Sequence, residues 1–135
     1  MDAAAKILIL GGLGSLLFSF LMAFVLAMSR LSDPQADRSL LLQVHRVSLW
    51  EGFMLLALVW AVALSDLSAG VESLAAVLLV GAAVLQITSN TMAWRSGNTN
   101  LFAPPRGLTY QLATANAVFA FIGLAILVVG ALKAL

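Results

Sequence analysis

Four long apolar runs, separated by short polar segments, dominate the chain. The runs cover about residues 6–29, 44–65, 73–94 and 109–132. A helix needs roughly 20 residues to cross the core of a bilayer and satisfies its own backbone hydrogen bonds there. The alternation typical of a lipid-facing barrel strand is absent. The pattern therefore predicts an all-α, four-helix transmembrane bundle that forms one integral membrane domain over residues 1–135.

The connectors between the runs carry the helix breakers. They read "RLSDPQADR" with Pro34, "SDLSAGVES" with Gly70, and "RSGNTNLFAPPRGL" with Pro104 and Pro105. The first apolar run, over 7–28, is longer than the 7 to 15 residues of a signal-peptide core. We therefore expect it to be retained as a span.

Charges suggest an orientation. An even number of spans puts both termini on one side, and the five arginines lie on the other, in the first and third loops or beside them: Arg30, Arg38, Arg46, Arg95 and Arg106. The positive-inside rule makes the arginine side cytoplasmic and places both termini outside, in a multi-pass protein of a bacterial inner (cell) membrane. Arginines that bind an anionic ligand would be poor guides to this topology.

Composition supports a membrane protein and narrows its chemistry. The chain is 62% hydrophobic and 10% charged, against roughly 25% charged in soluble domains. The net charge of +1 is scattered, which argues against a nucleic-acid partner. The chain has no cysteine, phosphate-binding glycine loop or HExxH motif, so thiolate metal sites and most hydrolytic schemes are excluded. His45 is the only imidazole.

Polar residues inside spans cost roughly 2.5 to 3.5 kcal/mol when charged at a helix centre, so each needs a reason. They are His45, Ser48 and Glu51 in the second run, Gln86, Thr88, Ser89, Asn90 and Thr91 in the third, and Asn116 in the fourth.

His45 stands at the start of the second run, next to Arg46. It is either an interfacial histidine or an axial haem ligand, since a neutral imidazole is a standard iron donor and nearby arginines pair with propionates. A single histidine argues against zinc, which takes three or four protein ligands.

Glu51 follows His45 by six residues, which places it about 9 Å deeper and about 120° around the helix. It is either a glutamate paired or kept neutral between helices, or an acid or base in a dry pocket. If both residues serve one site, the cofactor lies between protomers and the protein is an oligomer.

Gln86, Ser89 and Asn90 share one face of the third run, with Trp94 a turn beyond. Such a stripe is either polar glue between helices or the wall of a pocket for a small polar arene. Trp94 also fits an interfacial anchor.

The motifs "VHRVSLWEGF", "TSNTMAW" and "PPRGLTYQ" occur in this order on a four-span chain. In this they resemble, over the whole length, the hydroxylaminobenzene mutases, small membrane enzymes of nitroarene breakdown. The histidine segment, the third run and "RGLT" are also similar, more distantly, to the styrene oxide isomerases.

The resemblance to the isomerases implies haem b between the subunits of a homotrimer, with His45 as axial iron ligand. Asn90 matches their "SN" motif and Arg106 matches the arginine of "RGLT". Glu51 stands where they have asparagine, Gln86 where they have aspartate and Trp94 where they have tyrosine, which suggests a changed substrate.

The resemblance to the mutases implies conversion of hydroxylaminobenzene to 2-aminophenol without net redox change. Iron would act as a Lewis acid on the N–OH group, Trp94 would steady charge on the arene, and Glu51 would move the proton. We expect Asn90 and Gln86 to complete the catalytic pocket, and Arg46 and Arg106 to help His45 bind haem.

Three alternatives stay open. One is an epoxide isomerase like the styrene oxide enzymes. Another is a non-catalytic, haem-carrying electron-transfer subunit, for which Met28 and Met54 are the only obvious second ligands. The last is a scaffold subunit without a cofactor.

Overall fold

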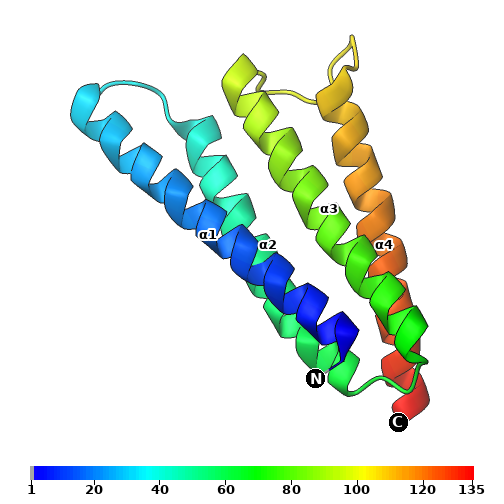
Figure 1. The fold of residues 1–135 in the computed structure, drawn as a ribbon. Helices are drawn as coiled ribbons and strands as arrows, with labels where there is room; N and C mark the ends of the chain where they lie inside the picture. Colours follow the sequence, from blue (N-terminus) through cyan, green and yellow to red (C-terminus); the bar gives the residue numbers. More distant parts are fainter. Residues whose placement is uncertain (1) are drawn as a thin grey trace.

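The computed structural model describes residues 2–135, which form four α-helices joined by short connections (Figure 1). The helices are α1 (Ala3–Ser32), α2 (Ser39–Ala63), α3 (Ala69–Ser96) and α4 (Leu108–Ala134). Each is long and apolar enough to cross a membrane. The predicted all-α bundle with four candidate spans is confirmed.

The helices extend beyond most of the predicted limits. The largest difference is at α2, which begins at Ser39 rather than at residue 44 and ends at Ala63 rather than at residue 65. Hydropathy marks the part of a helix suited to lipid, whereas the backbone hydrogen bonds of the helix continue until residues that favour another conformation end them. Before α2, Asp37 Oδ1 accepts the backbone N–H of Ser39 at 2.9 Å. At the end of α3, Gly97 takes a φ of 68°, a left-handed conformation that favours glycine.

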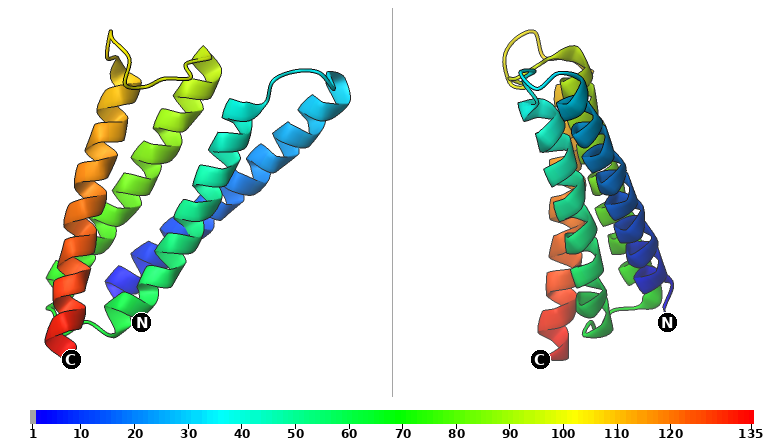
Figure 2. Two further views of the ribbon diagram at one scale, coloured as in Figure 1. Left: turned by 180° about the vertical axis from the view of Figure 1, so that it is seen from behind. Right: turned by 90° about the vertical axis from the view of Figure 1, so that its left-hand side faces the viewer.

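The chain folds as two antiparallel hairpins, α1–α2 and α3–α4, that converge at one end and diverge at the other (Figures 1 and 2). We call the converging end, with both termini and the 64–68 connection, the narrow end. The diverging end, with connections 33–38 and 97–107, is the wide end. The prediction that both termini share one side is confirmed by this arrangement.

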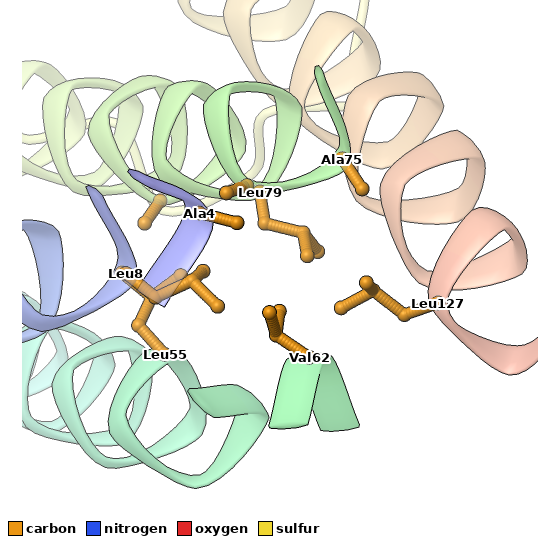
Figure 3. Close-up of a cluster of buried hydrophobic side chains, with 9 residues drawn as sticks. Ala4, Leu8, Leu55, Val62, Ala75, Leu79 and Leu127 are labelled. Carbon is orange, nitrogen blue, oxygen red and sulfur yellow. The ribbon is translucent and has the colours of Figure 1, made fainter. Parts of the chain in front are cut away.

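At the narrow end, all four helices contribute to one apolar core, several members of which are drawn in Figure 3. Its buried members are Ala4, Leu8, Leu55, Val62, Ala75, Ala76, Leu79, Ala83 and Leu127. Four of the nine are alanines, which let helix backbones approach closely. In a bilayer this close packing, rather than escape from water, stabilises helix association. The backbone N–H of Asp66 also donates to the carbonyl of Gly130 at 3.2 Å, which ties the 64–68 connection to α4.

Glycines set the closest approaches within each hairpin. A Cβ built on Gly12 would lie 3.0 Å from the carbonyl oxygen of Gly52, and one on Gly52 would lie 3.1 Å from that of Gly12. In the second hairpin, a Cβ on Gly123 would lie 3.1 Å from the carbonyl oxygen of Ala75. These backbone contacts fix the register in which α1 meets α2 and α3 meets α4.

Candidate functional site

His45 lies more than a turn inside α2 because the helix begins at Ser39. The half-buried imidazole contacts α1: its Nδ1 lies 3.0 Å from the backbone carbonyl oxygen of Ser19 and 3.0 Å from Ser19 Oγ. Ser19 Oγ also donates to the backbone carbonyl of His45 at 3.0 Å. Nε2 takes part in none of the hydrogen bonds found within residues 2–135, so it is the ring nitrogen that is available to a ligand.

Glu51 is half-buried on α2, and its Oε2 is buried without a hydrogen-bond partner among residues 2–135. It lies one turn from Leu55 of the apolar core, toward the wide end. An unpaired carboxyl oxygen at this depth is costly unless another group meets it. Glu51 is thus the least satisfied polar group of the predicted site.

The polar stripe of α3 forms hydrogen bonds with both neighbouring helices, α2 and α4. Gln43 Nε2 donates to Asn90 Oδ1 at 2.7 Å, which joins α2 to α3. Asn116 Nδ2 donates to Gln86 Oε1 at 2.6 Å, which joins α4 to α3, and Asn90 Nδ2 donates to the backbone oxygen of Gln86 at 2.9 Å. Ser89 Oγ donates to the backbone oxygen of Thr109 at 2.9 Å. Within this chain the stripe acts as polar glue, as one of the two sequence-based interpretations proposed.

These hydrogen bonds leave donors and acceptors to spare. With Oε1 of Gln86 bound by Asn116, the Nε2 group of Gln86 keeps its donors, and Asn90 Nδ2 keeps a second proton. The register that joins Gln43 to Asn90 places Gln86 about one turn, or about 6 Å, along the helix pair from Glu51. The polar glue and a pocket wall are therefore compatible uses of one stripe.

Trp94 lies a turn beyond Asn90 and is half-buried. It packs against a second apolar cluster near the wide end, whose buried members are Met22, Leu26, Leu41 and Val44. This cluster includes Val44, which directly precedes His45 on α2. Trp94 has tertiary contacts that a simple interfacial anchor lacks.

The two arginines predicted to bind haem lie on different hairpins. Arg46 is exposed on α2. Arg106 is exposed in the 97–107 connection, with its guanidinium 5.0 Å from the ring centroid of Tyr110. Stacking of this kind leaves the N–H edge of the guanidinium free to bind an anion. No hydrogen bond joins Arg46 to Arg106 within residues 2–135. Both would bind one ligand only if the ligand is large enough to reach both hairpins, or if the two arginines belong to different protomers.

A groove of about 480 Å³ lies elsewhere, between α1 and α3. Its three hydroxyl groups donate to backbone oxygens of their own helices and not to the groove: Ser15 to Gly11, Thr88 to Val84 and Thr91 to Ile87. It contains none of the predicted catalytic or haem-binding residues. The groove is an apolar surface with Arg95 at its rim, and volume alone does not make it the candidate active site.

Three residues that hydrogen-bond to the predicted site were not predicted from the sequence. Ser19 and Gln43 were not singled out, and Asn116 was given no role. Each is a polar residue in or beside a predicted span, which was the available signal. What hydrogen-bonds to each depends on helix register, which hydropathy does not give.

The donor set fits haem better than an isolated metal ion. No group of three or more His, Cys, Asp or Glu side chains is placed to hold a metal within residues 2–135. A haem needs only one axial imidazole, and His45 offers a free Nε2. Met54, nine residues from His45, lies about half a turn around α2 from it and faces away. These residues would offer a haem one imidazole nitrogen, Nε2 of His45.

Comparisons of the chain with protein-family models, with curated proteins and with solved structures found no match.

Proposed function

We propose that the protein is a haem-dependent membrane isomerase that converts hydroxylaminobenzene to 2-aminophenol. The observation that carries the proposal is the pairing of a half-buried imidazole, with Nε2 free, and a carboxyl oxygen buried without a partner on the same helix. The motif resemblance described above supplies the substrate class. Nε2 of His45 and Oε2 of Glu51 are both without a hydrogen-bond partner among residues 2–135 and are available to a ligand.

His45 would hold the haem iron through Nε2, and Arg46 and Arg106 would bind its propionates. When bound, haem would supply a Lewis acid for the oxygen of the N–OH group. Met54 faces away from His45 on the same helix, so the two residues of one chain would not bind the same iron.

The chain's own residues would handle the substrate and its protons. The nitrogen–oxygen bond breaks and a carbon–oxygen bond forms at the ortho carbon, so the ring loses one proton and the nitrogen gains one. Glu51 would accept the ring proton and return a proton to nitrogen, which balances the isomerisation. The amide donors of Gln86 and Asn90 would hold the substrate's polar end near the ring, where ortho return is faster than capture by water.

The site would be completed by a second protomer. His45 and Glu51 point about 120° apart on α2. His45 contacts α1, whereas Gln43 of α2 hydrogen-bonds to Asn90 of α3, the helix that also carries Gln86. A ligand on His45 Nε2 of one chain would meet Glu51, Gln86, Asn90 and Trp94 of another. We therefore propose a homo-oligomer, a trimer by resemblance, with haem between subunits.

The test is turnover of hydroxylaminobenzene by Glu51→Gln, with formation of 2-aminophenol followed by chromatography. Loss of an acid–base group lowers turnover by about 10²- to 10⁴-fold. Haem absorbance should stay at the wild-type level. Glu72→Gln is the matched control, because Glu72 is a buried glutamate in the first turn of α3 at the narrow end.

Wild-type turnover in Glu51→Gln would refute the proton-transfer role. Styrene oxide, assayed beside hydroxylaminobenzene, separates the two isomerase functions. Faster isomerisation of the epoxide would overturn the proposed substrate. A haem protein that is inactive on both substrates, with two axial ligands in its spectrum, would favour an electron-transfer subunit.

A further inference from the structure

Ser19 of α1 and His45 of α2 make three polar contacts with each other across the two helices. Ser19 is fully buried on α1. It meets His45 in three ways, each at 3.0 Å: its backbone oxygen and its Oγ both face Nδ1, and its Oγ donates to the backbone oxygen of His45.

Only one imidazole tautomer satisfies these contacts together. With a proton on Nδ1, the N–H donates to the carbonyl of Ser19, and the hydroxyl proton of Ser19 goes to the carbonyl of His45. With a bare Nδ1, its lone pair would face the lone pairs of the Ser19 carbonyl oxygen at 3.0 Å, which is repulsive. The contacts therefore assign the proton to Nδ1 and the lone pair to Nε2.

The close helix crossing places Ser19 opposite His45. Ser19 is seven residues after Gly12, and His45 is seven residues before Gly52. Since α1 and α2 run antiparallel, the two pairs share one register, about two helical turns apart. The Gly12–Gly52 approach brings the α1 backbone near enough for a carbonyl, rather than only a side chain, to reach the imidazole.

We propose that Ser19 is a positioning residue that fixes His45 as the Nδ1–H tautomer and presents Nε2 as the iron ligand. This rests on the proposed function for the identity of the group bound at Nε2. A ligating histidine commonly donates its other N–H to a backbone carbonyl or carboxylate, which sets ring orientation and basicity. Here the carbonyl comes from α1, and the Ser19 hydroxyl holds the α2 backbone against it.

The first measurement needs no haem. Because the chain has one histidine, ¹⁵N NMR of histidine-labelled apoprotein in detergent reports a single imidazole. We expect wild type to show Nδ1 protonated and Nε2 bare. A dominant Nε2–H form would overturn the proposal.

The second measurement is haem affinity, by titration of apoprotein followed by absorbance. Ser19→Ala keeps the backbone carbonyl that accepts the Nδ1–H and loses the hydroxyl that holds the two helices together there. It should weaken haem binding about 10-fold, the low end of the effect of losing a partner of a ligating residue, and should add some Nε2–H tautomer by NMR. Ser15→Ala is the control, since Ser15 lies one turn away, is also buried, and donates only to Gly11 of its own helix. Wild-type affinity with an unchanged tautomer in Ser19→Ala would refute the role of its hydroxyl.

A pair of glycine variants tests the register independently of the serine. Gly12→Ala places a Cβ 3.0 Å from the backbone oxygen of Gly52, so it should separate the helices and weaken haem binding as Ser19→Ala does. Gly14→Ala meets open space and should bind haem as wild type does. Equal haem affinity in the two glycine variants would contradict the proposed register.

The two proposals fail in different ways. Apoprotein with the Nδ1–H tautomer that binds no haem would refute the proposed function and leave the Ser19–His45 arrangement intact. Haem bound through His45 with equal affinity in wild type and Ser19→Ala would leave the proposed function intact and refute the positioning role.

Discussion

The narrow end and the wide end of the bundle differ in the residues that line them. Alanine, leucine and valine fill the narrow end, where all four helices meet in one apolar core (Figure 3). The wide end carries His45, the Gln43–Asn90 bond and the loops with Arg38 and Arg106, and there the hairpins diverge (Figure 1). Close packing stabilises the first region. The second keeps polar groups whose hydrogen-bonding capacity the single chain does not exhaust.

This difference suggests a division of roles between scaffold and site. Glu51 lies at the boundary, one turn from the core residue Leu55 on the side of the wide end. A rigid apolar core beneath polar residues holds them in place without adding competing donors. Changes at the narrow end should therefore act on stability, and changes at the wide end on ligand binding.

The largest expected effect on stability comes from Leu79→Ala in the narrow-end core. Leu79 is 1% exposed, so its truncation leaves a cavity among all four helices. We expect a loss of about 2 kcal/mol, the low end of the range for buried leucines, because lipid replaces part of the transfer term. Denaturant unfolding in detergent measures it.

Leu17→Ala is the matched control, since Leu17 is 73% exposed on α1 and its truncation leaves no cavity. Equal losses in Leu79→Ala and Leu17→Ala would show that the narrow end is not the stabilising region.

A smaller effect is expected from the bond between Gln43 and Asn90 at the wide end. A double-mutant cycle with Gln43→Leu and Asn90→Leu should give a coupling of about 0.6 kcal/mol, the mean for interhelical hydrogen bonds in a membrane. Unfolding free energies of the four proteins measure it. A coupling as large as the loss in Leu79→Ala would remove the distinction between the two ends.

Hydropathy was sufficient to predict the helices and their antiparallel order, because the bilayer imposes a length and an apolar surface on each span. It underestimated α2, which begins at Ser39 and includes the short segment from Ser39 to Gln43 before Val44. The separation of His45 and Glu51 also followed from helix geometry alone. These features depend on one segment at a time.

Features that depend on two segments were not predicted. The Ser19–His45 contact follows from the Gly12–Gly52 crossing, and the Gln43–Asn90 bond from the way α2 meets α3. Register between helices is set by a few close contacts among many small residues, and several registers would satisfy the same hydropathy pattern. The roles predicted for Glu51, Gln86, Asn90 and Trp94 in catalysis stay predictions.

The most direct test of the central claim is the absorption spectrum of detergent-purified protein, recorded for wild type and His45→Ala with and without hydroxylaminobenzene. The account predicts a Soret band in wild type that shifts when hydroxylaminobenzene is added, and loss of both the band and 2-aminophenol formation in His45→Ala. A colourless wild-type protein that still forms 2-aminophenol would contradict it.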